Sequence, residues 1–152
     1  MRSEANVSPT PSDDSSQRPR TGANRPAAQI AWLQGAGPPR EMVHRLENQF
    51  EEQGIPIRVT TVGLNESDVF PYYDLLILEY LRGNRRELAR IIANIRRACA
   101  APIIVLARCA VAELTVVALR AGADTVIPLN TTDEVIVARC RALLRRWHAT
   151  SH

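Results

Sequence analysis

The stretch DLLILEYLRG, Asp74 to Gly83, decides the fold of this chain. Four consecutive apolar residues, Leu75 to Leu78, run directly into a carboxylate, Glu79. A short apolar run bounded by polar residues is typical of a strand that is buried on both faces of a parallel sheet. Because chemistry in open parallel sheets gathers at the carboxyl ends of the strands, Glu79 is a candidate site residue.

Two kinds of apolar pattern alternate along the chain. Strand-like runs are AQIAWL (28–33), IPIRVTTVG (55–63), DLLILE (74–79), PIIVLA (102–107) and DTVIPL (124–129). Helical patterns lie between and after them at 39–54, 84–100, 112–122 and 131–147. This alternation predicts an α/β fold, a doubly wound five-stranded parallel sheet of order 2-1-3-4-5 with helices on both faces.

Several residues are expected to bound the helices. Gly54 and Gly122 follow helical patterns and are predicted to stop them. Pro71 is expected to break or end any helix in the segment 65–73. Thr131 and Glu134 have the spacing of a capping box at the start of the last helix. The inward stripe predicted for that helix is Val135, Ile136, Cys140, Leu143 and Leu144.

Composition limits the possible functions. The chain has 152 residues, enough for one domain with a core, and 45% of them are hydrophobic. All 19 basic residues are arginine, so mechanisms that need a lysine amine are excluded. We expect a cytoplasmic protein with no membrane span and with cysteines that act as small hydrophobes. The predicted divisions are a disordered leader (1–27), the domain (28–148) and a tail (149–152).

Three segments together resemble the receiver domain of two-component response regulators. They are YYDLLILEYLRG, APIIVLA and ALRAGADTVIPLNTTDEVIVARCRALLRRW, and the resemblance extends over about residues 28–147. The resemblance implies a domain that binds Mg²⁺, accepts a phosphoryl group on an aspartate and relays that event to an output surface.

This sequence departs from the family at each position that carries this chemistry. Glu79 stands at the phosphoacceptor position, and the positions of the acidic pair that holds Mg²⁺ are Gln34 and Gly35. The expected hydroxyl residue, aromatic switch residue and lysine are replaced by Ala107, Val126 and Leu129. Mg²⁺ needs several oxygen ligands, and a transferring phosphoryl group needs its charge neutralised. We therefore expect no bound metal, no cofactor and no enzymatic activity.

Glu79 has two interpretations. As a mimic of a phosphorylated aspartate, it would hold the domain in an active-like state, but Ala107 and Leu129 lack the groups that would sense it. Alternatively, Glu79 is a pocket carboxylate paired with an arginine, with Arg82 and Arg108 the nearest in sequence.

With the pocket altered, function is expected on surfaces. In the family, helix four, strand five and helix five often form a dimer or docking face, here predicted at 112–122, 124–129 and 131–147. Some charged positions of that face are uncharged in this chain. The interface candidates are Leu114, Thr115, Val117, Thr125, Val135 and Arg139, with Val126 and Val137 nearby. The alternative is that several of these residues face the core.

Arginine clusters at 82–97 and 139–146 suggest either nucleic-acid binding or solvated helix faces. We expect nucleic acid to be involved only indirectly, because aromatic residues are 5% of the chain and no helix-turn-helix follows. The prediction is an atypical receiver domain that acts in signal transduction as a phosphorylation-independent interaction or dimerisation module. The alternatives are the regulatory domain of a DNA-binding response regulator whose output domain lies elsewhere, and an enzyme that reuses the scaffold.

Overall fold

The computed structural model describes residues 27–34, 41–81, 84–108 and 112–150, so the predicted leader lies outside it except for Ala27. The strands are β1 (Ala28–Gln34), β2 (Ile57–Gly63), β3 (Leu75–Tyr80), β4 (Ile103–Ala107) and β5 (Thr125–Pro128). The helices are α2 (Glu41–Glu52), η4 (Ser67–Tyr72), α3 (Arg85–Ala98), α4 (Ala112–Ala121) and α5 (Asp133–Thr150). The helix α5 extends two residues past the predicted end of the domain.

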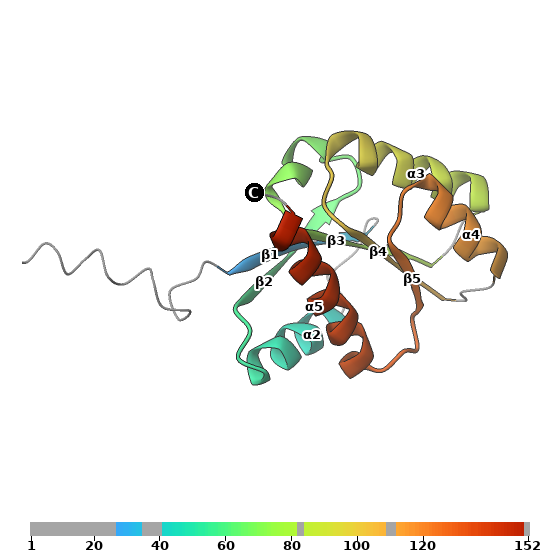
Figure 1. Cartoon of the computed structure of the whole chain (residues 1–152). Helices are drawn as coiled ribbons and strands as arrows, with labels where there is room; N and C mark the ends of the chain where they lie inside the picture. Colours follow the sequence, from blue (N-terminus) through green and yellow to red (C-terminus); the bar gives the residue numbers. More distant parts are fainter. Residues whose placement is uncertain (1–26, 35–40, 82–83, 109–111, 151–152) are drawn as a thin grey trace, which may run out of the picture.

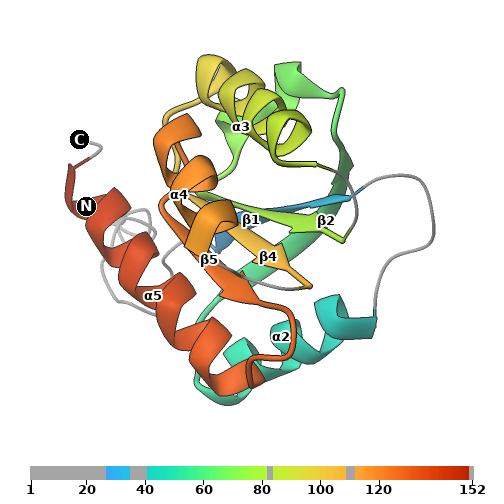
Figure 2. The ribbon, with the colours of Figure 1, turned by 90° about the vertical axis from the view of Figure 1, so that its right-hand side faces the viewer.

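The five strands form one parallel sheet in the order β2-β1-β3-β4-β5, which confirms the predicted fold class. Helices cover both faces: α2 and α5 lie on one side, and α3, α4 and η4 lie on the other (Figures 1 and 2). Each side has its own apolar cluster. Ile30, Trp32 and Ile77 point toward α2 and α5, while Leu33, Leu76 and Leu78 point toward α3 and η4.

The central strands explain why two helical layers are needed. Residues Leu75–Leu78 of β3 and Ile103–Leu106 of β4 have side chains that are at most 1% exposed. Successive strand residues point to opposite faces, so an uninterrupted apolar run must be covered on both. The Asp74–Gly83 stretch therefore has the structure that its pattern predicted as far as the described residue Leu81.

Two glycines end helices as expected. Gly54 after α2 has a φ of 72°, and Gly122 after α4 has a φ of 126°, a region that is strained for side chains with a Cβ. At the start of α3, the Asn84 side chain accepts a hydrogen bond of 2.7 Å from the backbone N–H of Glu87. Pro71 lies inside the short 3-10 helix η4 instead of ending it.

Two predictions for α5 differ from the structure: the capping residue and the side that Val135 faces. The helix begins at Asp133, and the hydroxyl that accepts from the third helical N–H is that of Thr132, 3.4 Å from Val135 N, rather than that of Thr131. Val135 is 42% exposed, whereas Val137 is fully buried. The buried stripe of α5 runs through positions 136, 137, 140, 143 and 144, so Val135 falls outside it.

Arg96 joins three segments at the amino-terminal edge of the sheet. Its guanidinium donates to the carbonyls of Gly122 at 2.6 Å and Ala101 at 2.7 Å, and to the carboxylate of Asp124 at 3.2 Å. The same carboxylate accepts from the N–H of Ile103 at 2.8 Å. One arginine of the basic helix α3 is thus part of the structure rather than of a solvated face.

None of the described helices is both long and apolar enough to cross a membrane.

We predict that Arg96→Met lowers the free energy of unfolding by about 2 kcal/mol, because two loop carbonyls and a carboxylate lose a charged donor. The neighbouring Arg97→Met is the matched control. The Arg97 side chain contacts the Asn94 amide at the surface, so its loss should cost less than about 0.5 kcal/mol. Urea unfolding followed by circular dichroism measures both values, and equal losses would contradict the role given to Arg96.

Candidate functional site

The carboxyl edge of the sheet brings the predicted site residues together. Gln34 ends β1, Glu79 is the second-last residue of β3, Ala107 ends β4 and Leu129 follows β5. The register aligns Tyr80 with Ala107 and Ala107 with Pro128, so these positions share one edge. Gly35, the other position of the expected acidic pair, lies outside the described residues.

Glu79 is half-buried and accepts a hydrogen bond from Trp32. The indole Nε1–H of Trp32 lies 3.2 Å from Oε1 of Glu79. Trp32 is fully buried and pairs in register with Ile77, two residues before Glu79, so both side chains point to the α2/α5 face. A donor from the neighbouring strand offsets part of the cost of burying the carboxylate.

Sequence reasoning missed Trp32 as a site residue. The sequence did contain a signal for it. Trp32 and Gln34 are two residues apart on β1 and so lie on one face of the sheet, as Ile77 and Glu79 do on β3. The register that places the indole beside the carboxylate is a property of the sheet. Of the two arginines predicted as partners of Glu79, Arg82 lies outside the described residues and Arg108 is exposed after β4.

The next residue, Tyr80, anchors the connection to α3 from the opposite face. Its hydroxyl donates to the carbonyl of Asn84 at 2.7 Å and lies 3.5 Å from the carboxylate of Glu87. Burial raises the pKa of Tyr80 above its usual value, and the charge of Glu87 raises it further. The phenol therefore stays protonated and acts as a hydrogen-bond donor.

The remaining positions of the site supply no polar group. Ala107 is 2% exposed, Val126 packs against the α3/α4 cluster, and Leu129 packs against the α2/α5 cluster. The backbone N–H of Leu129 donates to the carbonyl of Ala107 at 2.7 Å, which closes the edge between β4 and the end of β5. The side chains at these positions offer neither a hydroxyl nor an amine to a phosphoryl group.

These residues do not fit a magnesium site. Mg²⁺ prefers near-octahedral oxygen ligands and is commonly anchored by carboxylates. At this edge the described oxygen-bearing side chains of the family positions are those of Glu79 and the buried Gln34. No group of three or more His, Cys, Asp or Glu residues is positioned to hold a metal ion within the described ranges.

The two described cysteines lie in surroundings that disfavour the thiolate form. Cys140 is buried in α5, and burial raises the pKa of its thiol to about 12. Cys99 is half-buried, and burial raises its pKa as well. A thiol with a raised pKa carries little thiolate near neutral pH, so both behave as small hydrophobes, as the sequence suggested. Cys109 lies outside the described residues.

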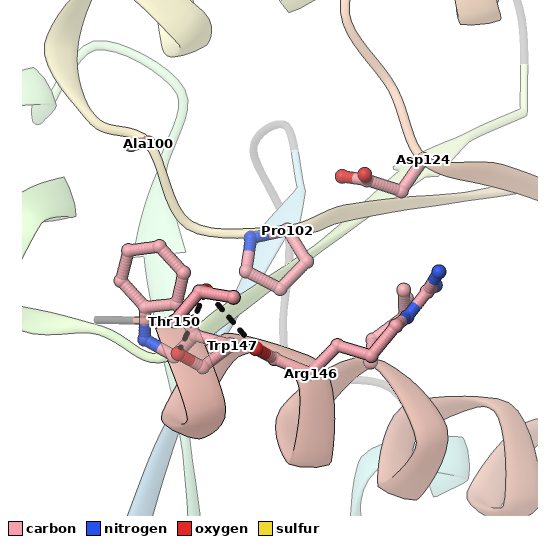
Figure 3. A pocket seen from close by; sticks show the side chains of 7 residues that line it. Ala100, Pro102, Asp124, Arg146, Trp147 and Thr150 are labelled. Atoms are coloured by element: carbon pink, nitrogen blue, oxygen red, sulfur yellow. Dashed lines mark hydrogen bonds between the residues drawn. The ribbon is translucent and has the colours of Figure 1, made fainter. Parts of the chain in front are cut away.

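An open pocket of about 240 Å³ lies at the opposite edge of the sheet from Glu79. Figure 3 shows Trp147, Arg146 and Thr150 from the last turns of α5 facing Pro102 and Asp124. The Thr150 hydroxyl is used within the helix, donating to carbonyls at 3.0 and 3.3 Å. The Asp124 carboxylate is bound by Arg96 and Ile103. The pocket lining holds no pair of nucleophile and base.

Comparison with known proteins finds similarity at the level of structure. No protein-family model and no curated protein sequence matches the chain. A response regulator structure from Clostridium difficile is 25% identical, with a TM-score of 0.61 over 78% of this chain and 97% of that one. One from Thermotoga maritima is 17% identical, with a TM-score of 0.63 over 78% and 98%. The pilus assembly protein CpaE from Caulobacter crescentus is 15% identical, with a TM-score of 0.60 over 76% and 98%.

The sheet order and the helical layers place the chain in the flavodoxin-like class of doubly wound α/β domains. Within that class, the structural neighbours include receiver domains of response regulators. The chain has the receiver-domain fold, as its sequence segments indicated.

We predict that Trp32→Phe lowers the free energy of unfolding by about 2 kcal/mol, because it leaves a small cavity and removes the donor to Glu79. Glu79→Gln is the control. Its amide oxygen can still accept from the indole, so the loss should stay below about 1 kcal/mol. Chemical unfolding gives both values, and a Glu79→Gln loss as large as that of Trp32→Phe would show that the carboxylate has a more important partner than the indole.

Proposed function

We propose that this receiver-fold domain works in signal transduction as a protein-interaction module that needs no phosphorylation and catalyses no reaction. The observation that carries the proposal is the state of Glu79, a half-buried carboxylate held by Trp32 at an edge whose other positions are Ala107, Val126 and Leu129. A receiver fold supports a signalling role, and the altered edge supports independence from phosphoryl transfer.

The chemistry of the edge favours a silent pocket over a phosphate mimic. A carboxylate that mimics a phosphate changes the conformation of a domain when other side chains move toward its charge. In the family, these side chains are a hydroxyl residue and a lysine. Ala107 and Leu129 provide only apolar contacts. Glu79 already accepts from a fully buried indole, which fixes one carboxylate oxygen on the α2/α5 face. The charge of Glu79 is therefore held in place rather than relayed.

We predict that Mg²⁺ followed by beryllofluoride, a mimic of an acyl phosphate, leaves the amide NMR signals of Glu79, Ala107 and Leu129 unchanged. The physical reason is that the edge lacks the carboxylates that bind the metal and the cation that balances the phosphoryl charge. A phosphorylatable receiver domain in the same buffer is the positive control. Joint shifts of the three amides at low ligand concentration would reject phosphorylation independence.

The surface that we propose for the interaction runs over α4, β5 and α5, which adjoin one another on one side of the molecule (Figure 2). Val116 is 45% exposed and Leu119 44%, and both lie on the outer side of α4; Val135, at the start of α5, is 42% exposed. Sequence reasoning included Val135 but missed Val116 and Leu119, because an apolar helix without clear alternation does not reveal its outer side.

The other candidates for this surface fall into two groups. Arg139 is exposed, and Thr115, Val117 and Thr125 are half-buried, so they can border the contact. Leu114 packs against the α3/α4 cluster, and Val137 is buried, so the apolar surface is narrower than the sequence indicated. Three exposed apolar side chains beside an arginine suit the composition of a protein interface better than that of a solvated helix. We propose either a second copy of this chain or another protein as the partner.

We predict that Leu119→Glu shifts the protein toward monomer in sedimentation equilibrium, with an association constant at least about tenfold weaker, because a charge would be buried in an apolar contact. Leu64→Glu is the matched control, since Leu64 is an exposed leucine in the β2–η4 connection. A chain that is monomeric at high concentration before any substitution would remove the homodimer and leave a different protein as the partner.

A further inference from the structure

A groove beside the edge strand β2 is lined by other kinds of residue than the carboxyl-edge site of Glu79 and the pocket beside Trp147. It lies between α2 and the beginning of β2 and has a volume of about 420 Å³. Its apolar wall is formed by Ile55, Pro56 and Ile57, and its polar wall comes from Glu47, Asn48 and Glu51 of α2. Ile55 and Ile57 are half-buried against the core, so the apolar wall is anchored rather than free to move.

The polar wall of the groove carries more negative charge than the neighbouring cation of α2 neutralises. Glu47 is engaged, because Oε2 accepts from the N–H of Val59 at 3.2 Å. Glu51 is exposed on the next turn, and the cation of α2, Arg45, is committed to Asp133 at 3.0 Å on the other side of the helix. The hydrogen bond to Asp133 raises the pKa of Arg45, which keeps that pair charged. A side chain with an aliphatic stem and a cationic head would satisfy both walls of the groove.

The groove opens where the amino-terminal segment of the chain joins the sheet. The backbone N–H of Ala28 donates to the carbonyl of Pro56 at 2.9 Å, and Ala28 pairs in register with Ile57. Residues 15–26, SSQRPRTGANRP, are therefore tethered covalently to a residue that lies next to the apolar wall. They contain three arginines and no acidic residue. Their composition is too polar to form a core of their own, so any order that they acquire has to come from contact with an existing surface.

We propose that the segment 17–25 of the same chain docks in the α2–β2 groove, with Arg18 or Arg20 facing Glu51 and its aliphatic stem against Ile55 and Ile57. The reach is sufficient, because the seven residue steps from Arg20 to Ala27 span up to about 23 Å when extended. The tether also favours this occupant over a separate molecule, since a short linker gives an effective concentration in the millimolar range.

Docking would also cover an edge of the sheet. Among the strands that the structure describes, β2 pairs only with β1, and exposed strand edges invite pairing with other chains. Two carboxylates already protect part of this edge, Glu47 at Val59 and Glu66 at Gly63, each accepting from a backbone N–H at 3.2 Å. Neither contact lies at the beginning of β2, where the groove opens. The docked segment would complete the cover at that end.

Limited trypsin digestion of the full chain tests the proposal. Trypsin cleaves after Arg20, whereas Arg18 and Arg25 are each followed by proline and resist cleavage. We expect Glu51→Gln to be cleaved after Arg20 about two- to fivefold faster than the parent chain, since a single exposed ion pair contributes little. Glu52→Gln is the matched control, because Glu52 has the same charge on the same helix but does not line the groove. Its cleavage rate should equal that of the parent.

Amide NMR of the full chain gives an independent measurement. The double substitution Arg18→Gln with Arg20→Gln should shift the signals of Ile55 and Ile57 and leave those of α3 and α4 in place. Equal cleavage of the Glu51 and Glu52 variants, or unchanged Ile55 and Ile57 signals, would overturn the docking. Trypsin cleavage after Arg20 that becomes slower at higher protein concentration would also overturn docking within one chain. It would show that the groove binds the segment of a second copy.

Discussion

Strands β3 and β4 turn apolar side chains toward both faces of the sheet, so water has to be excluded from both faces. This requirement explains the two helical layers, with α2 and α5 over the Trp32 side and α3, α4 and η4 over the Leu33 side. It also explains the parallel order, because right-handed crossovers return each helix to the face it covers. The carboxyl ends of the strands are thereby brought beside one another.

The carboxyl edge combines the geometry of a receiver fold with its own set of side chains. The positions of a receiver active site still meet there, but a tryptophan binds the carboxylate, and alanine and leucine occupy positions where polar groups act in the family. The change is coherent in physical terms. A hydrogen-bond donor from the neighbouring strand helps to offset the cost of keeping the Glu79 carboxylate half-buried. A shared fold does not by itself fix the chemistry of such an edge, since function depends on the residues placed there.

Much of the fold was predictable, and the errors are instructive. Uniform apolar runs identified β3 and β4, and Gly54 and Gly122 marked two helix ends, because those signals depend on local sterics and on burial of whole segments. The predicted capping residue of α5 and the predicted inward orientation of Val135 were wrong, whereas the buried position of Val137 matches one of the two alternatives left open for it. A rotation of one residue changes a helical side chain by about 100°, and packing against the sheet selects the rotation.

The sequence by itself determined the fold class, the loss of lysine chemistry and the altered identity of each receiver site position, since these follow from residue types and their order. Only the tertiary structure decided that Trp32 binds Glu79, that Arg96 joins α3 to two loops, and that the groove of α2 and β2 opens beside the start of β1. These contacts join residues that lie far apart in the chain. Their geometry depends on strand register and helix rotation, which the packing of the whole domain sets.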